Sequence, residues 1–332
     1  MSQCAAILNP GLTGQVLLYY LTENEQIALE HRPIDGAQYA RYTDNGTLPG
    51  HVVTPGSLCV ALRQGVPYVY GFTKPKDEQT VAAGSAAGGS GGEKPPAAKT
   101  SIISKVSPLY NPVTVSSSTP TSKTTSTLPG LAACSDGELI DYVYFLNVHT
   151  DEEGNTVKKI FQATITAGSD DPNVGALEKC PLVYSQSKLT AVTLLKGMGR
   201  LVFFQDLGTT SKKEIHYINA GLDGEPHNVP GTDTADHGTS IAVTYIGNSA
   251  GHTLFLYWLS KTNDLMRSIG TYEAVSKTWA WKPSENMTGA GPVEQKGAIA
   301  AVCDGNHNHV FYKKSGGKEF SSFKDDLANV KI

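Results

Sequence analysis

Six short runs of small and apolar residues recur along this chain of 332 residues and constrain its fold more than any other feature. Each is followed by a turn, a second run rich in aromatic residues, a polar turn and a third run. The clearest copy is IAVTYIGNSAGHTLFLYWLS at 241–260, where Gly and Asn separate two β-branched and aromatic stretches. This is the pattern of a β-hairpin, so the chain is built from repeated hairpins.

The repeat predicts an all-β fold, a six-bladed β-propeller formed by residues 1–332 as a single domain. One small sheet cannot bury both of its faces, whereas sheets stacked around an axis cover one another. The small residues of each first run suit the crowded innermost strand. A sandwich or barrel is the alternative. The residues that mark equivalent positions, at intervals of 51–72 residues, are Ala6, Ala61, Ala133, Val192, Val243 and Ala301.

One interval is long because the second unit contains an insertion. The tract TVAAGSAAGGSGGEKPPAAK at 80–99 is dominated by Gly, Ala, Ser and Pro. Such a composition cannot repay the entropy lost on ordering, so a flexible loop is predicted at about 78–100. The loop is either an idle surface segment or a lid over one mouth of the propeller.

Charge and hydropathy exclude several classes of function. The net charge is −4 with no basic stripe, so a nucleic-acid partner is not expected. No stretch approaches 18 uninterrupted apolar residues, so no membrane span is predicted. The N-terminal residues lack the pattern of a signal peptide, which favours a cytoplasmic location. The oligomeric state is left open.

The sequence predicts neither a metal nor a cofactor. Five cysteines occur without metal-ligand spacing. Four of them lie in or beside short apolar runs and are interpreted as small buried hydrophobic residues rather than a catalytic thiol or a disulfide framework: Cys4, Cys59, Cys134 and Cys303. His307 and His309 in DGNHNH stand two residues apart in a turn, and solvated imidazoles are the favoured interpretation over a metal site.

A small-molecule site is predicted at one axial mouth, on the loops that precede each first strand and the ends of the second strands. The combination of polar groups with aromatic walls is typical of such sites. The polar candidates are His51, Lys188, His237 and Gln295. The aromatic candidates are Tyr20, Phe72, Phe204, Tyr257 and Trp258.

The stretch TLFLYW…LMRSIGTYEAVSKTWAW, within 241–281, resembles a blade of the fungal fucose-binding lectins, which are six-bladed propellers. In those lectins a second-strand Arg and a third-strand Glu grip the sugar, and an aromatic residue stacks on it. Here only Glu30 matches the Glu, and the Trp recurs in one unit, as Trp279 or Trp281. None of the residues near the Arg position is Arg: Leu17, Tyr68, Tyr142, Leu201, Leu254 and Val310.

By length, propeller pattern and the missing sugar motif, the chain also resembles lectin-like hetero-Diels–Alderases of fungal tropolonic sesquiterpenoid pathways. This resemblance implies that a tropolone ortho-quinone methide is joined to a macrocyclic sesquiterpene alkene of the humulene type. The partners would be polyketide and terpene small molecules, without a cofactor. His237 or His51 would act as general acid or base, and Lys188 would hold the tropolonate oxygens.

Three alternatives to a pericyclase are kept open. A glycan-binding propeller would have several sites between blades and bind fucosylated resin. A scaffold propeller would present a flat, uncharged face to a protein partner. An unrelated hydrolase or lyase is the third alternative.

Overall fold

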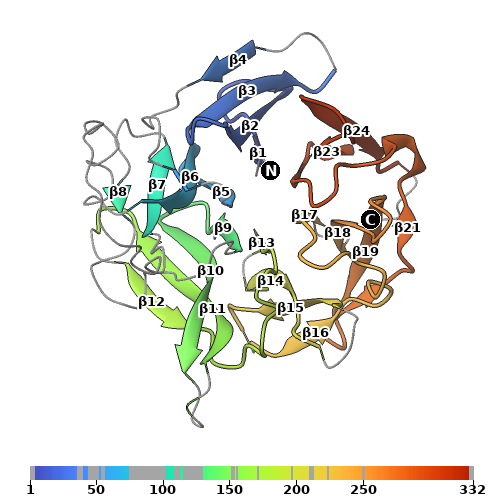
Figure 1. The fold of residues 1–332 in the computed structure, drawn as a ribbon. Coiled ribbons are helices and arrows are strands. Elements are labelled where there is room, and N and C mark those ends of the chain that lie inside the picture. Colours follow the sequence, from blue (N-terminus) through green and yellow to red (C-terminus); the bar gives the residue numbers. More distant parts are fainter. Residues whose placement is uncertain are drawn as a thin grey trace, which may run out of the picture.

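The computed structural model arranges six antiparallel sheets as a ring around a central axis (Figure 1). Within each sheet, neighbouring strands follow chain order, as in the blades of a six-bladed β-propeller. The predicted fold class is therefore confirmed, whereas the predicted insertion lies outside the described residues. The structure describes residues 4–35, 40–43, 52–53, 57–74, 102–107, 113–114, 130–150, 154, 156–169, 172–195, 197–208, 213–222, 224–248 and 251–328.

The first three blades each have four strands, numbered outward from the axis. Blade 1 contains β1 (Cys4–Leu8), β2 (Gln15–Leu21), β3 (Ile27–Pro33) and β4 (Ala40–Thr43). Blade 2 contains β5 (Leu58–Arg63), β6 (Val66–Thr73), β7 (Ile102–Ser107) and β8 (Val113–Thr114). Blade 3 contains β9 (Leu131–Ser135), β10 (Ile140–Thr150), β11 (Thr156–Thr166) and β12 (Asn173–Ala176).

The second half of the ring repeats this plan with small variations. Blade 4 contains β13 (Thr190–Thr193), β14 (Arg200–Gln205), β15 (Ile215–Asn219) and β16 (Pro226–Asn228). Blade 5 contains β17 (Ile241–Asn248), β18 (Gly251–Leu259), β19 (Leu265–Glu273), β20 (Thr278–Trp281) and β21 (Glu285–Asn286). A 3₁₀ turn, η3 (Thr288–Ala290), leads to the described strands of blade 6, β22 (Ile299–Cys303), β23 (His307–Lys313) and β24 (Phe320–Asp326).

Six clusters of buried hydrophobic side chains fill the spaces between neighbouring blades. The cluster that closes the ring joins β1 of blade 1, through Cys4, to β22 of blade 6, through Ala300. Side chains of a strand alternate between its two faces, so successive residues of one inner strand serve two different clusters. Each blade is therefore stabilised by both neighbours, as the repeat predicts.

This alternation corrects the sequence alignment in two blades by one residue. Ala133 and Val243 face the preceding blade, but the predicted equivalents Ala61 and Val192 face the following one. The true equivalents are Val60 and Ala191, because a slip of one residue turns a side chain to the other face. Isolated bridges support this register, since each bridging residue stands eight positions before the equivalent residue of its blade: Val52, Val183, Ala235 and Val293.

A ring of six buried aromatic residues runs through the second strands. In the corrected register, the equivalent residue of each first strand pairs with one residue of the second strand, and the aromatic residue comes directly after that partner. Each aromatic side chain packs into the core shared with the next blade. Each is at most 3% exposed. These residues are Tyr19, Tyr70, Tyr144, Phe203, Tyr257 and Phe311.

Each ring aromatic faces the following blade near one position there, three residues before that blade's own ring aromatic. In five of six blades the residue at this position is polar where the aromatic is Tyr and apolar where it is Phe. The phenols are met by polar groups, with Asp141 2.5 Å from Tyr70, Arg200 3.0 Å from Tyr144 and Asn308 2.7 Å from Tyr257. Phe203 packs in a cluster that contains Leu254, and Phe311 packs in one that contains Val16; both partners hold this position in their blades. Tyr19 is the exception, since Pro67 holds this position in blade 2. Polar groups are thus placed where a buried hydroxyl needs a partner.

Candidate functional site

A cavity of about 140 Å³ lies on the propeller axis and is lined by all six inner strands. Its volume is below the roughly 300–1,000 Å³ of ordinary small-molecule pockets, so it can enclose one small group rather than two substrates. The small side chains predicted for the first runs form most of its wall. The lining segments are 4–6, 57–60, 131–133, 188–191, 240–243 and 299–301.

Of the described residues that line this cavity, Lys188 is the one cationic residue, and none is Asp or Glu. Burial lowers the pKa of the Lys188 ammonium to about 8, because the low-dielectric surroundings disfavour the charged form. Among the described residues, no hydrogen bond or ion pair to its ammonium is formed. Among the described residues, the cavity is therefore lined by a lysine of lowered pKa and by no carboxylate, at the end of the axis where the inner strands begin.

Hydrogen bonds hold the loop that carries Lys188. The Ser187 hydroxyl donates to the Lys188 carbonyl (2.9 Å) and accepts from the backbone N–H of Gln205 (2.8 Å). The fully buried Gln205 side chain donates to the Asp236 carbonyl and accepts from the Gly238 N–H, which ties the loop before β17 to blade 4. These bonds fix the point from which Lys188 enters the cavity.

Two serines, two cysteines and Thr190 are the other described residues of the wall whose side chains carry a hydroxyl or a thiol. Ser57 and Ser240 directly precede the inner strands β5 and β17, and the sequence analysis missed them although they occupy the predicted kind of loop. Ser240 Oγ accepts from the Ile299 N–H (3.1 Å). Burial raises the pKa of the Cys4 and Cys59 thiols well above the usual range, so both are protonated. The interpretation of the cysteines as buried hydrophobic residues fits this environment.

The predicted aromatic wall does not line the cavity. Phe72, Phe204, Tyr257 and Trp258 are at most 1% exposed and belong to the cores between blades. Tyr20 is half-buried and packs on Phe320, with ring centroids 5.4 Å apart. The second strand of a blade lies one strand away from the axis, so its side chains fill the space between blades. The prediction of an aromatic-walled axial pocket is therefore corrected.

The remaining polar candidates also lie apart from the cavity wall. His237 is half-buried beside Tyr184, with ring centroids 6.0 Å apart, and its backbone N–H donates to Asp236 Oδ1. Gln295 is exposed on the loop before β22. His51 lies outside the described residues. Of the sequence-predicted site, the structure brings Lys188 alone into the cavity.

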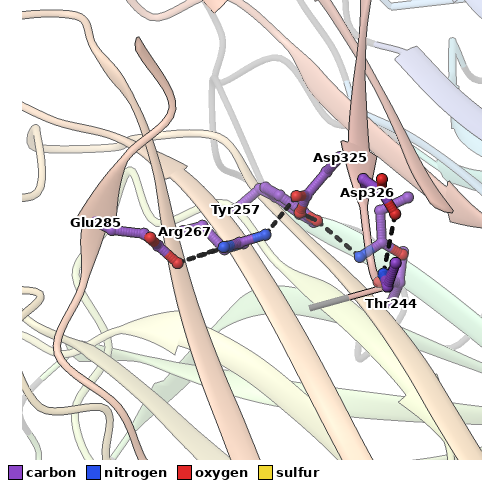
Figure 2. Close-up of polar contacts among 8 residues, drawn as sticks. Thr244, Tyr257, Arg267, Glu285, Asp325 and Asp326 are labelled. Carbon is purple, nitrogen blue, oxygen red and sulfur yellow. Dashed lines mark hydrogen bonds and ion pairs between the residues drawn. The ribbon is translucent and has the colours of Figure 1, made fainter. Parts of the chain in front are cut away.

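The largest polar network described between blades joins blades 5 and 6 (Figure 2). Arg267 forms ion pairs with Glu285 and Asp325, while the Tyr257 hydroxyl donates to Asp325 Oδ2 (2.5 Å) and accepts from Asn308 Nδ2 (2.7 Å). Burial, together with the Asp325 carboxylate, raises the pKa of Tyr257 well above its usual range. Arg267, Glu285 and Asp325 therefore each have an oppositely charged partner within the network.

At two other interfaces, an arginine also contacts side chains of the neighbouring blade. Arg63 pairs with Asp141 (3.1 Å) and lies 4.3 Å from the Tyr68 ring centroid. Arg200, the first residue of β14, stacks 3.6 Å from the Tyr142 centroid. The Glu30 carboxylate of blade 1 is 1% exposed and pairs with its neighbour Arg32. The contacts of Arg63 and Arg200 join neighbouring blades, and Arg32 also donates to the Phe320 carbonyl of blade 6 (2.9 Å). The described partners of these groups are therefore internal.

The ring of six sheets defines a six-bladed β-propeller, a fold that solved fungal lectins share. The SapL1 lectin in complex with alpha methyl fucoside superposes with a TM-score of 0.60 at 12% identity, covering 99% of this chain and 97% of that one. The fucose-specific lectin from Aleuria aurantia gives 0.59 at 15% identity, covering 98% and 95%. AofleA from Arthrobotrys oligospora gives 0.56 at 13%, covering 98% and 87%. At these identities the likeness shows the fold.

Two curated relatives from fungi match nearly the whole sequence. The wall-associated proteinase of Coccidioides immitis (strain RS) is 28% identical over 319 residues, which is 95% of this chain and 92% of the relative. The same identity and coverage hold for the wall-associated proteinase of Coccidioides posadasii (strain RMSCC 757 / Silveira). No family model matches the chain. In the described residues, no helix has the length and hydropathy needed to cross a bilayer.

Proposed function

We propose that this propeller binds the anionic oxygen atoms of a small molecule at Lys188 and acts on it as a hetero-Diels–Alderase. The observation that carries the proposal is the position of Lys188, a cation in the wall of the axial cavity, which no carboxylate of the described residues lines. A tropolone ortho-quinone methide is the proposed bound diene, and a humulene-type alkene is its partner. The pathway would be one of fungal secondary metabolism.

The electrostatics of the cavity suit a delocalised oxyanion. Because burial desolvates the Lys188 ammonium, an ion pair with it is stronger than it would be in bulk solvent. Withdrawing charge from the oxygens of a bound heterodiene lowers the energy of its empty orbital and speeds addition of an electron-rich alkene. With the pKa of Lys188 lowered to about 8, the amine is still mostly protonated at pH 7 and can do this.

The reaction needs no nucleophile and no redox partner from the protein. A hydroxymethyl tropolone loses water to give the ortho-quinone methide, whose C=C–C=O unit then adds across the alkene. One C–C bond and one C–O bond form in the same step. The contributions of the protein are to hold the partners face to face, worth several kcal/mol as effective molarity, and to exclude water from the reactive intermediate.

The size of the cavity determines how the substrates would be divided. At about 140 Å³ it would accept the oxygen-bearing edge of the diene. The macrocyclic alkene would meet the diene at the mouth where the inner strands begin. Lys188 is the one predicted catalytic residue on which the proposal relies, since His237 lies apart from the cavity wall.

The test is turnover of a hydroxymethyl tropolone with humulene by the purified chain, with chiral analysis of the product. One enantiomer should form faster than in the protein-free control. Lys188→Met should lower the rate by about 10- to 100-fold, the size of a lost charge-assisted contact of 1.5–3 kcal/mol. Lys188→Arg should retain part of the activity, and Lys314→Met, an exposed lysine, should match the wild type.

Racemic product at the background rate would overturn the proposal. Glycan binding is the alternative that the lectin neighbours suggest, and retention on fucosylated resin would favour it. The internal partners of Arg63, Arg200 and Arg32 weigh against a repeated sugar grip. The proteinase name of the curated relatives is a further alternative. The described imidazoles of His252 and His309 bond to a tyrosine and a carboxylate.

A further inference from the structure

The turn between β22 and β23 of blade 6 gathers three metal-ligating side chains. Asp304 Oδ2 lies 2.8 Å from His309 Nε2 and 3.5 Å from His307 Nδ1. All three donor atoms lie within 4.8 Å of one another. Since β22 ends at this turn, the cluster is at the end of the propeller opposite the beginning of the inner strands, where Lys188 lies. It is not part of the axial cavity.

The local sequence explains this arrangement. His307 and His309 stand two apart at the start of β23, so the strand presents both on one face. Asp304 directly follows β22 and begins the turn, and its Oδ1 accepts from the N–H groups of Asn306 (2.8 Å) and His307 (2.7 Å). These bonds leave Oδ2 directed at the imidazoles. The prediction of solvated imidazoles is wrong for His309, which is 4% exposed.

We propose that Asp304, His307 and His309 bind a divalent transition-metal ion, with Zn²⁺ the best match. Two neutral imidazoles and one carboxylate are the ligand set of open zinc sites, which keep a further position for water or a ligand oxygen. At bond lengths of about 2.0–2.2 Å, tetrahedral donors lie about 3.3 Å apart. The gap between Asp304 and His307 already matches, and the Asp304–His309 gap needs to widen by about 0.5 Å.

The charges around the three ligands allow a cation. The Asp304 carboxylate accepts from two backbone N–H groups through Oδ1 and faces His307 and His309 through Oδ2. On the neighbouring strand β24, Asp326 lies opposite His307 and Lys324 lies opposite His309 in the strand register, and both Asp326 and Lys324 are exposed. Their opposite charges offset one another. The backbone bonds to Oδ1 supply the outer support that metal-binding carboxylates commonly have.

The experiment is calorimetric titration of the full chain, stripped with chelator, with Zn²⁺ alone, together with the visible spectrum on adding Co²⁺. One saturable ion per chain is expected, with d–d bands of a four- or five-coordinate site. Asp304→Asn and His307→Asn should each weaken binding at least about 100-fold, since outer-shell changes alone cost 10–100-fold. His227→Asn, a half-buried histidine in blade 4, is the matched control and should bind as the wild type does.

The variants are chosen so that a folding defect does not obscure the result. Asp304→Asn retains an Oδ1 acceptor for the turn, and His307 has a side chain 25% exposed. Circular dichroism would confirm that both remain folded. The absence of saturable 1:1 binding in the wild type, or an unchanged affinity in both variants, would overturn the proposal.

Discussion

The aromatic ring between the blades leads to a sharp prediction for Tyr257→Phe. The change keeps the ring and deletes a hydroxyl that donates to Asp325 and accepts from Asn308, residues that are 4% and 0% exposed. A hydrogen bond to a charged group is worth about 1.5–3 kcal/mol, and a buried donor left unpaired costs about 1–3 kcal/mol. Tyr257→Phe should therefore lower the free energy of unfolding by about 3 kcal/mol.

Tyr19→Phe is the matched control in the same ring. Tyr19 is 3% exposed, but its hydroxyl forms no hydrogen bond with another described residue. Burial alone raises its pKa to about 12. Removing this hydroxyl leaves no orphaned partner, so the cost should stay below about 0.5 kcal/mol. The two variants delete the same atom from equivalent positions and differ in what that atom contacts.

Urea unfolding followed by tryptophan fluorescence measures both. With a slope of about 3 kcal/mol/M, Tyr257→Phe should move the midpoint down by about 1 M and Tyr19→Phe by less than about 0.2 M. Asn308 Oδ1 also accepts from the buried Thr244 hydroxyl (2.8 Å). The added changes Asn308→Leu, which copies the Phe203 and Leu254 pairing, and Thr244→Val should together recover about 1–2 kcal/mol, because neither buried group is then left unpaired. Equal midpoints for the two single variants would refute the assignment of the cost to the hydrogen bonds.

Three further predictions concern the cavity and one turn. Lys188→Met should stabilise the protein at pH 7 by up to about 3 kcal/mol, because a pKa lowered to about 8 makes the folded state bind fewer protons than the unfolded one; wild-type stability should rise between about pH 8 and 10.5 in urea midpoints, and that rise should vanish in the variant. A thiol reagent should modify no cysteine of the native chain faster than Cys303, because the other four are buried; rapid loss of a second thiol, identified by peptide mapping, would contradict this. Gly199→Ala should cost clearly more than Gly197→Ala in thermal unfolding, since both glycines have φ near +85 to +90° but a Cβ at 199 would overlap the Asn219 side chain while 197 meets nothing within 4 Å; the expected costs are about 3 and about 1 kcal/mol, and equal costs would disprove the steric argument.

The sequence by itself determined the number of blades and the character of the axis. Hairpin periodicity and small first runs are local properties, and a sheet that cannot bury both faces alone must stack on its neighbours. Lys188 was predictable for the same reason, because it stands in the loop directly before an inner strand. Ser57 and Ser240 also stand directly before inner strands, but serine is common in loops, so nothing in the sequence distinguished these two from other loop serines.

The tertiary structure decided which side chains share a space. The register of Val60 and Ala191 depends on packing against two neighbouring blades, and a one-residue slip reverses the face without changing the local pattern. Trp258 shows an end-of-strand aromatic buried between blades, because the second strand stands back from the axis. The meeting of Asp304 with His309 depended on the turn conformation, in which backbone N–H groups orient the carboxylate. Contacts that cross between blades, or that depend on how a turn closes, have no signature in the linear sequence, since they arise only when the ring is formed.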